Sequence, residues 1–406
     1  MKFEDYHISK GIKSQLEVLG FKRPTDIQFK AIKHVLDGED VMAIAQTGTG
    51  KTAAFVIPTL NAIHFDKKRK GISCLVMVPT RELAEQISKV YQEIGKEVSV
   101  RTMSLFGGVE QDAQIEQLNG QIDVLVTTPG RMFDLISQKK IDLSNLKTLV
   151  LDEADLMLDM GFYKDIEDVQ RFLPRKHQTL FFSATISPRI KKMAYKIVSN
   201  KAIRIQISPK NPVAKNVAHS VVYVEMDDKR FFLENTLKEF PDSKMLIFAR
   251  TQVRVERVVK AMERVGIKSE ALHGGVEQAE RFKILERFRS NETLVLVTTD
   301  VAARGIDIPN VDYVINYDLP ENPENYVHRC GRTGRGKEYG QAISFCSELE
   351  KELVDEIEEY TGDEIERYSI TKKEYEEILR DTDDGSNDWE SLLKDANNED
   401  GTGDEW

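Results

Sequence analysis

Cysteine is scarce in this chain of 406 residues, which contains only Cys74, Cys330 and Cys346. The three lie far apart, are odd in number and lack the close pairs that mark a zinc site. Their pattern argues against a disulfide framework and is more typical of a protein in a reducing compartment. We therefore expect neither redox nor zinc chemistry.

The sequence also lacks an apolar run long enough to cross a membrane. Its first residues, MKFEDYHISKG, contain no apolar stretch after the first basic residue, so they do not look like a secretory signal. The sequence therefore predicts a protein without membrane segments, and we expect it in the cytoplasm.

Basic charge is in deficit, because the formal net charge is −11. The deficit is concentrated in residues 381–406, which hold ten acidic side chains and one basic side chain, Lys394. This segment accounts for −9 and leaves about −2 for everything before it. A nearly neutral body can still carry a basic groove, so the acidic balance does not exclude an RNA partner.

Short apolar runs rich in β-branched residues alternate with amphipathic helical segments in both halves of the chain. The runs begin at Val41, Cys74, Val124, Thr148 and Thr179 in the first half, and at Ser220, Met245, Thr293, Tyr313 and Ala342 in the second. This pattern is typical of parallel sheets covered by helices, so we predict an α/β fold with two similar domains, residues 1–207 and 217–372.

Two segments lie outside these domains. Residues 208–216, SPKNPVAKN, contain two prolines and little apolar periodicity, which predicts an exposed, flexible linker. Residues 373–406 are acidic and poor in apolar side chains, so we expect a disordered tail.

A glycine-rich segment, AQTGTGKT, lies between the apolar run from Val41 and a helical stretch, which is the context that a phosphate-binding loop requires. Its backbone N–H groups could wrap phosphates, Lys51 could supply a cation, and the Thr52 hydroxyl could bind magnesium. The candidate loop residues are Thr47, Gly48, Thr49, Gly50, Lys51 and Thr52. Ala45 stands where the simple motif has glycine, and the alternative is an ordinary turn rich in glycine and threonine.

Two carboxylates follow the apolar run from Thr148. Asp152 would hold Mg²⁺, and Glu153 would orient or deprotonate the water that attacks the γ-phosphoryl group of ATP. Acidic residues are also common at the start of a helix, so helix capping is the alternative interpretation. The phosphate-binding loop favours the catalytic one.

Residues 152–155 read Asp-Glu-Ala-Asp, and the other motifs of one helicase family appear in order before and after them, over roughly residues 3–346. The chain therefore resembles the DEAD-box family of RNA helicases. The resemblance implies two tandem RecA-like domains, each a mostly parallel sheet flanked by helices, that close on ATP and an RNA strand.

The resemblance also implies further nucleotide contacts. Residues 20–28 are similar to the Q motif, in which Phe21 would stack on adenine and Gln28 would hydrogen-bond its edge. Ser183 and Thr185 would couple the nucleotide state to domain closure. In the second domain, the residues implied at the nucleotide are Gly305 and Asp307, together with Arg332 and Arg335 as arginine fingers at the γ-phosphate.

A second set of residues resembles the RNA-binding motifs of the family. It comprises Pro79, Thr80, Arg81, Gly108, Pro129, Gly130 and Arg131 in the first domain, and Arg250, Thr251, Gln278, Arg281 and Thr299 in the second. Arg250 replaces a residue that is commonly polar and uncharged. Contacts of this kind grip the backbone, so RNA binding should not depend on sequence. Taken singly, each arginine is more simply explained as a surface ion pair.

The sequence thus predicts a monomeric, RNA-stimulated ATPase that opens short RNA duplexes. One alternative is an ATP-gated RNA clamp that rarely unwinds, and a weaker one is a DNA-directed motor. The acidic tail contains Trp389, Leu392 and Leu393, which could form a short helix for a protein partner or for self-docking. A disordered, solubilising end is the alternative there.

Overall fold

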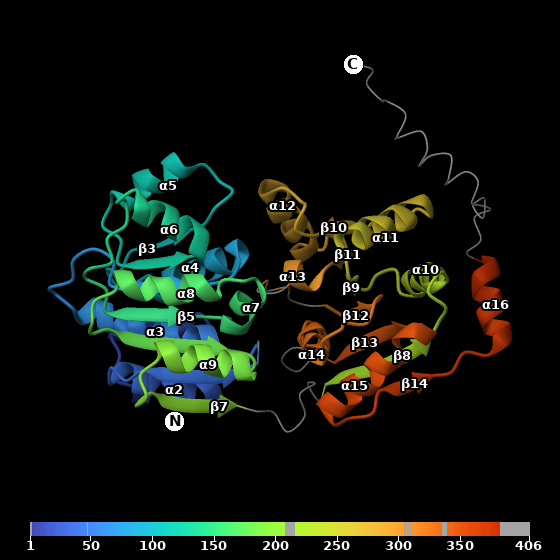
Figure 1. Ribbon diagram of the computed structural model, residues 1–406, viewed down its shortest axis with the longest axis horizontal. Helices are drawn as coiled ribbons and strands as arrows, with labels where there is room; N and C mark the ends of the chain where they lie inside the picture. The colour runs from blue at the N-terminus through green and yellow to red at the C-terminus, as the bar shows by residue number, and fades with distance from the viewer. Residues whose placement is uncertain are drawn as a thin grey trace, which may run out of the picture. The chain divides into compact units, whose positions relative to one another are not determined.

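The computed structural model describes residues 2–46, 48–207, 216–303, 306, 308, 311–334 and 339–381. The described residues up to 207 form one compact unit, and those from 216 to 303 and from 308 to 381 form a second (Figure 1). Residues 208–215 of the expected linker and residues 382–406 of the expected tail lie outside the described residues.

The first unit is built on a parallel sheet of seven strands in the order β3-β4-β2-β5-β6-β1-β7. The strands are β1 Val41–Ala45, β2 Cys74–Met77, β3 Thr102–Leu105, β4 Val124–Thr127, β5 Thr148–Leu151, β6 Gln178–Ser183 and β7 Ile203–Ile207. Every residue of β1, β2, β4 and β5 is buried, as expected for parallel strands covered on both faces.

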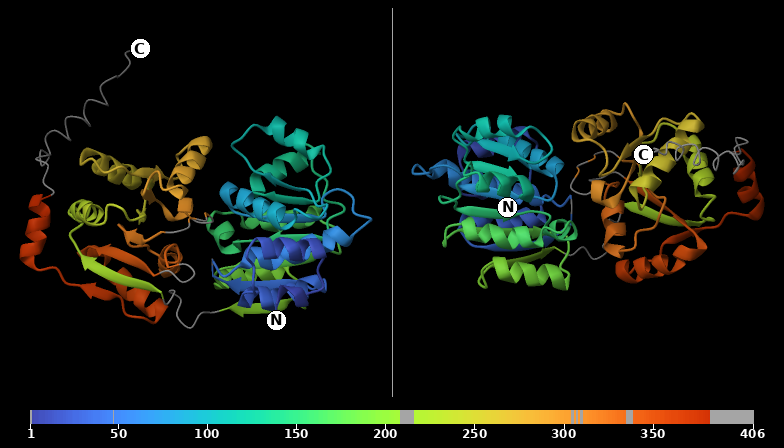
Figure 2. Two further views of the ribbon diagram at one scale, coloured as in Figure 1. Left: turned by 180° about the vertical axis from the view of Figure 1, so that it is seen from behind. Right: turned by 45° about the horizontal axis from the view of Figure 1, so that its top comes forward.

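Helices cover both faces of this sheet (Figure 2). They are α1 Lys10–Val18, α2 Asp26–Leu36, α3 Lys51–Phe65, α4 Arg81–Ile94, α5 Gln111–Leu118, α6 Pro129–Ser137, α7 Ala154–Asp159, α8 Tyr163–Val169 and α9 Pro188–Ile197, with single 3-10 turns at Phe3–Asp5 and Gln170–Phe172. Alternate residues of β1 point into different cores, because Val41 and Ala43 pack with α1 to α4 whereas Met42 and Ile44 pack with α6 to α9.

The second unit repeats this architecture with a parallel sheet in the order β10-β11-β9-β12-β13-β8-β14. Its strands are β8 Val217–Tyr223, β9 Met245–Phe248, β10 Glu270–Leu272, β11 Val295–Thr298, β12 Tyr313–Asn316, β13 Gly340–Cys346 and β14 Glu366–Tyr368. Its helices are α10 Lys229–Glu239, α11 Gln252–Arg264, α12 Gln278–Arg289, α13 Asp300–Ala303, α14 Pro323–Cys330, α15 Lys351–Thr361 and α16 Lys372–Asp381, with a 3-10 turn at Glu348–Glu350. The predicted fold class, two α/β units with parallel sheets, is confirmed.

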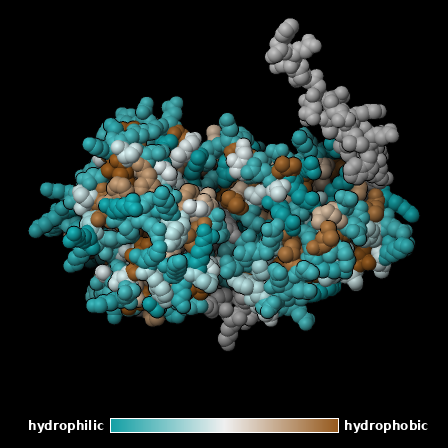
Figure 3. All heavy atoms as spheres, viewed as in Figure 1, coloured by the Kyte–Doolittle hydropathy of each residue, from teal (hydrophilic) through white to brown (hydrophobic). Residues whose placement is uncertain are grey.

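The surface of the protein is mainly hydrophilic, and its cysteines lie in the interior. On the face drawn in Figure 3, hydrophobic residues form small separate groups on a mainly hydrophilic surface. All three cysteines are free and buried, and burial raises the pKa of the Cys330 thiol to about 12. None of the helices in the described part of the chain is both long and apolar enough to span a membrane.

The start of the expected tail is folded, which differs from the prediction of a disordered segment from residue 373. Residues 372–381 form α16, which packs against α10. The Tyr375 ring lies 4.8 Å from the Phe232 ring, centroid to centroid, and its hydroxyl donates to Asp228 Oδ2 at 2.7 Å. The same hydroxyl accepts from the Glu225 N–H at 3.1 Å. Ile378 of the same helix also packs against the core, so two apolar side chains hold this polar segment on the second unit.

Replacing Tyr375 should loosen the end of the second unit. We expect Tyr375→Ala to lower the free energy of unfolding of the second unit by about 1–2 kcal/mol, because a half-buried ring and two hydrogen bonds are lost. Tyr375→Phe keeps the ring, so it should cost less than half as much. Hydrogen exchange in α10 and α16, measured across a denaturant series, gives the free energy of unfolding for each variant. An equal decrease in Tyr375→Ala and Tyr375→Phe would contradict the role of the ring.

Candidate nucleotide and RNA-binding sites

The phosphate-binding loop leads from the buried strand β1 into α3. Gly50 precedes the helix with a φ of +93°, and a Cβ atom there would lie 2.5 Å from Gln28 Nε2. Glycine is therefore required at this position for both conformation and space. The Thr49 hydroxyl closes the turn by donating to the Gln46 carbonyl at 2.7 Å. Thr47 lies outside the described residues.

Lys51, the first residue of α3, forms a buried ion pair with Glu153. Its Nζ donates to Glu153 Oε1 at 2.9 Å, and only 5% of the lysine side chain is exposed. Burial alone would lower the pKa of Lys51, but the carboxylates of Glu153, Asp152 and Asp155 outweigh it and raise that pKa. The ammonium group therefore stays charged inside the unit, close to the glycines of the loop.

The two candidate catalytic carboxylates occupy the turn between β5 and α7. Glu153 has a left-handed backbone, with φ +51° and ψ +50°, which is unusual for a residue other than glycine. It occupies the N-cap position of α7, yet its side chain makes no capping hydrogen bond and meets Lys51 instead. The helix-capping interpretation is therefore wrong for this side chain.

Asp152 is 2% exposed and accepts a hydrogen bond from the Glu153 N–H at 3.0 Å. Burial raises its pKa to about 7, with Glu153 adding to the rise and Lys51 opposing it. A buried carboxylate of this kind gains from a nearby cation. Asp152 and the Thr52 hydroxyl at the start of α3 are both hard oxygen donors, which suits magnesium rather than a softer metal.

Asp155 connects this turn to the end of β6. Its Oδ2 accepts from the backbone N–H groups of Ala184 and Thr185, at 3.1 and 3.0 Å. Ser183, the last residue of β6, is fully buried, and its hydroxyl has no hydrogen-bond partner among the residues that the structure describes. Residues 183–185, predicted to couple the nucleotide state to domain closure, are thus hydrogen-bonded to the turn that carries Asp152 and Glu153. The link is Asp155, to which the sequence analysis gave no role.

Gln28 is 3% exposed, and both ends of its amide are used within the unit. Its Nε2 donates to the Gly50 carbonyl at 3.1 Å, and its Oε1 accepts from the Thr25 N–H at 3.0 Å. Phe21 lies edge-to-face against Phe3, with centroids 6.0 Å apart, beside a cavity of about 470 Å³. The structure thus links the Q-motif helix to the phosphate-binding loop and leaves space at Phe21.

The candidate RNA-binding residues of the first unit gather around the loop after β3. The Arg81 guanidinium lies so close to Gly108 that a Cβ atom on this glycine would be 2.0 Å from Nη1. Arg131 reaches the same loop, donating to the Val109 carbonyl at 3.0 Å and to Gln114 Oε1 at 2.6 Å. Thr80 caps α4 by accepting from the Leu83 N–H, and Pro129 and Gly130 form the first turn of α6.

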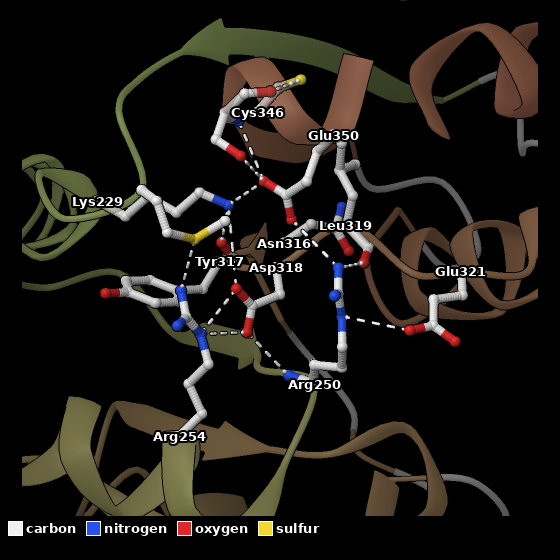
Figure 4. Close-up of polar contacts among 12 residues, drawn as sticks. Lys229, Arg250, Arg254, Asn316, Tyr317, Asp318, Leu319, Glu321, Cys346 and Glu350 are labelled. Atoms are coloured by element: carbon white, nitrogen blue, oxygen red, sulfur yellow. Dashed lines mark hydrogen bonds and ion pairs between the residues drawn. The ribbon is translucent and has the colours of Figure 1, made fainter. Parts of the chain in front are cut away.

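In the second unit, Arg250 belongs to a network of buried charges (Figure 4). Its backbone N–H donates to Asp318 Oδ2 at 3.0 Å, and its guanidinium to Glu350 Oε1 at 3.3 Å. Arg254 donates to Asp318 at 2.7 Å, and Lys229, which is fully buried, donates to the Tyr317 carbonyl at 2.9 Å and pairs with Glu350. Arg250 itself keeps 42% of its side chain exposed.

The remaining predicted residues of this unit lie at strand ends and helix starts. Thr251 caps α11 by accepting from the Arg254 N–H at 3.2 Å. Gln278 begins α12, and Arg281 in the same helix donates to the His273 carbonyl at 2.9 Å. Thr299 follows β11 and accepts from the Ala302 N–H at 3.4 Å. Gly305, Asp307 and Arg335 lie outside the described residues.

Arg329 is a residue to which the sequence analysis gave no role. It is 2% exposed and forms two hydrogen bonds with the Asp300 carboxylate, at 2.6 and 2.7 Å. Its Nη1 also donates to Asn316 Oδ1 at 3.0 Å and to the Asp318 carbonyl at 2.7 Å. Arg329 thereby fixes α14, which leads directly to the buried Arg332, against the start of α13.

Comparisons with known proteins agree with this geometry. Residues 25–193 match the model of the DEAD/DEAH box helicase family, and residues 228–337 match that of the helicase conserved C-terminal domain. The chain is 39% identical over 361 residues to the ATP-dependent RNA helicase DbpA of Bacillus subtilis, across 89% of this chain and 74% of DbpA. It is also 39% identical to the DEAD-box ATP-dependent RNA helicase CshA of Bacillus cereus, across 88% of this chain and 68% of CshA.

The chain belongs to the DEAD-box family of ATP-dependent RNA helicases.

Solved structures of other DEAD-box proteins share the fold. S. cerevisiae Dbp5 bound to RNA and ADP BeF3 matches with a TM-score of 0.82 at 30% identity, over 94% of this chain and 98% of that one. Mss116p bound to ssRNA and AMP-PNP matches with a TM-score of 0.83 at 28% identity, over 93% of this chain and 81% of that one. The two units are therefore the tandem RecA-like domains that the resemblance implied.

The contact between Arg81 and Gly108 predicts a change in RNA affinity. Gly108→Ala should cost about 1 kcal/mol of stability, because alanine disfavours its φ of +76°, and its methyl group should displace the Arg81 guanidinium. We expect RNA affinity to fall by about fivefold to tenfold, as for the loss of one charged contact.

Gly38→Ala is the matched control for this variant. Its φ is +79°, but a Cβ atom there would meet no atom within 4 Å. The control should lose similar stability and keep the wild-type RNA affinity in a fluorescence titration. Equal loss of affinity in both variants would show that backbone strain, and not the position of Arg81, is responsible.

The raised pKa of Asp152 predicts a stability that depends on pH. In the absence of magnesium and nucleotide, Asp152→Asn should raise the melting temperature at pH 8, because it removes a buried charge beside Glu153. The gain should shrink as the pH falls below about 7, where the wild-type carboxyl group takes up a proton in the folded state. The control Asp112→Asn, at an exposed position of α5, should leave the melting temperature unchanged at both pH values. If Asp152→Asn raised the melting temperature equally at pH 6 and pH 8, the raised pKa of Asp152 would be contradicted.

Proposed function

We propose that this DEAD-box protein hydrolyses ATP with Mg²⁺ at the loop of the first unit. We further propose that RNA-stimulated closure of its two units opens short RNA duplexes without reading their sequence. The observation that carries the proposal is the buried cluster of Lys51, Glu153 and Asp152 beside the glycine turn of the phosphate-binding loop.

The Lys51–Glu153 pair offers a simple switch. In the structure, the ammonium group of Lys51 donates to Glu153 at 2.9 Å. The phosphate oxygens of ATP carry more negative charge than one carboxylate, so they would compete for Lys51 at the open end of the loop. Glu153 would then be released to orient the attacking water and accept its proton.

Magnesium would be held by Asp152 and the Thr52 hydroxyl, together with phosphate oxygens and water. In the part of the chain that the structure describes, no group of three or more His, Cys, Asp or Glu side chains could hold a metal by itself. A site that relies on one protein carboxylate and on the nucleotide fits this donor set. The metal would neutralise charge on the phosphates.

The second unit would complete the nucleotide site with Arg332 and Arg335, aided by Gly305 and Asp307. The double hydrogen bond between Arg329 and Asp300 supports this proposal, because it anchors the turn that carries Arg332. Guanidinium groups stabilise the charge that spreads over the γ-phosphoryl oxygens in the transition state. Since these arginines belong to the second unit, hydrolysis should require closure of the two units. Asp155, Ser183 and Thr185 would couple the nucleotide state to that closure.

RNA would be held by its backbone. In the first unit, the N-terminal turns of α4 and α6 and the glycine loop at Gly108 present N–H groups, and Arg81 adds positive charge. In the second unit, Arg250, Thr251, Gln278, Arg281 and Thr299 would continue the track. Dbp5 and Mss116p have been solved with RNA bound, which supports a similar track here. We propose that the protein acts as a monomer and that the acidic tail contacts a protein partner.

Loss of the Glu153 carboxylate tests the catalytic part. Glu153→Gln keeps the size of the side chain, and we expect RNA-stimulated ATP turnover to fall by about a hundredfold or more while ATP binding remains. Glu263→Gln on the exposed face of α11 is the matched control and should turn over ATP normally. Unchanged turnover in Glu153→Gln would remove Glu153 from the mechanism.

A strand-displacement assay on the unmodified chain tests the functional part. Blunt and tailed RNA duplexes should be opened when they are short, and DNA should stimulate ATP turnover far less than RNA. Stable RNA binding with an ATP analogue but little strand release would instead favour an ATP-gated clamp. Equal stimulation by DNA would favour a DNA-directed motor.

A further inference from the structure

A cavity of about 500 Å³ lies in the second unit between the sheet, α10 and α16. Its walls come from β8, β12, β13, β14 and the two helices, and they include none of the described residues assigned above to the nucleotide or RNA sites. α16 lies beside α10 in all views of Figures 1 and 2. The volume falls in the range of sites that bind a large side chain or a small ligand.

The floor of the cavity is apolar and only partly covered. Phe240, Tyr313, Ile343, Ile370 and Ile378 line it, and each is a partly buried side chain at the edge of the core below. The Phe240 and Tyr313 rings are stacked, with centroids 5.0 Å apart. Large apolar side chains of this kind, gathered in a concave site, mark a place where another apolar group can be buried.

The rim of the cavity carries negative charge. Glu239 comes from α10, Glu374 and Glu377 come from α16, and all three are exposed. Among the residues that the structure describes, the cavity is lined by no lysine, arginine or histidine. Glu374 accepts from the Thr371 N–H and hydroxyl, both at 2.8 Å, and Glu377 pairs with the exposed Lys373 at 3.4 Å.

The charge decides which occupant fits. RNA would be repelled by the rim, and so would the acidic segment 382–406 of this chain, which carries nine acidic residues against Lys394. That segment follows α16 directly and would add to the attraction of a cation. A peptide with an apolar anchor and flanking lysines or arginines complements both the floor and the rim.

We propose that the cavity beneath α16 is a docking site for a basic segment of a partner protein. An aromatic or branched aliphatic side chain of the partner fills the cavity, and its basic neighbours pair with Glu239, Glu374 and Glu377. Docking at this place leaves the nucleotide and RNA residues of the second unit free, so the helicase can be carried to a basic partner while it works. The proposal does not depend on the mechanism of hydrolysis.

The test uses the full chain and a short synthetic peptide in which one tryptophan lies between pairs of lysines. Binding is measured by fluorescence anisotropy at low and at physiological salt. Two further peptides serve as controls, one with serine in place of tryptophan and one with glutamate in place of the lysines. We expect the first peptide to bind about tenfold more tightly than the serine peptide, and the glutamate peptide not to bind.

Variants locate the site. The double variant Glu239→Lys and Glu377→Lys should weaken the lysine–tryptophan peptide by about tenfold, since the charge of the rim is reversed. Thr236→Trp should fill the cavity and remove the preference for tryptophan over serine. The matched control, Glu263→Lys with Glu352→Lys, makes the same change in charge on exposed faces of α11 and α15 and should leave affinity within about twofold. RNA-stimulated ATP turnover should stay normal in all three, which checks their folding.

Several results would overturn the proposal. One is equal weakening by the cavity variants and by the matched control, which would show only general attraction to an acidic protein. Another is loss of binding on removal of residues 382–406 with no effect of the rim variants, which would place the peptide on the tail alone. Binding of a tryptophan peptide without lysines at full affinity would show an apolar site with no preference for a basic partner.

Discussion

The buried ion pair between Lys51 and Glu153 is the interaction on which the account of this helicase depends. It joins the ends of two strands, β1 and β5, and places a cation and a carboxylate 2.9 Å apart where little water reaches them. A buried pair of this kind is costly to desolvate and costly to break, so it adds little net stability. In the mechanism proposed above, Lys51 would exchange Glu153 for a phosphate of ATP, and Glu153 would exchange Lys51 for the attacking water.

The sequence predicted the centre of each sheet and missed the edges. All five central strands of each sheet were found as continuous apolar runs, because such strands are buried on both faces. The unpredicted strands are β3, β7, β10 and β14, the outer strands of the two sheets. Each of them contains exposed or half-buried residues, so no fully buried apolar run marks them. α16 was missed for a related reason, since it is mostly polar and packs against the core through Tyr375 and Ile378.

In the candidate sites, too, some residues could be predicted from the sequence and others could not. Lys51, Asp152 and Glu153 could be found because each follows a buried strand within a recognisable spacing. The residues that hold the motifs in place could not, because their partners are distant in the chain. Arg329 meets Asp300, Asp155 meets Thr185, and Glu350 joins Lys229 to Arg250. Such pairs form only in the folded chain and cannot be predicted from the local sequence.

The central claim, that ATP and RNA together bring the two RecA-like units onto one nucleotide, is tested most directly by a distance measurement between them. The native cysteines are buried, so dyes can be attached to cysteines introduced at exposed Asp112 and Lys260. The account predicts that energy transfer between the dyes changes only when a non-hydrolysable ATP analogue and RNA are both present. No change with both ligands, or the same change with RNA alone, would contradict it.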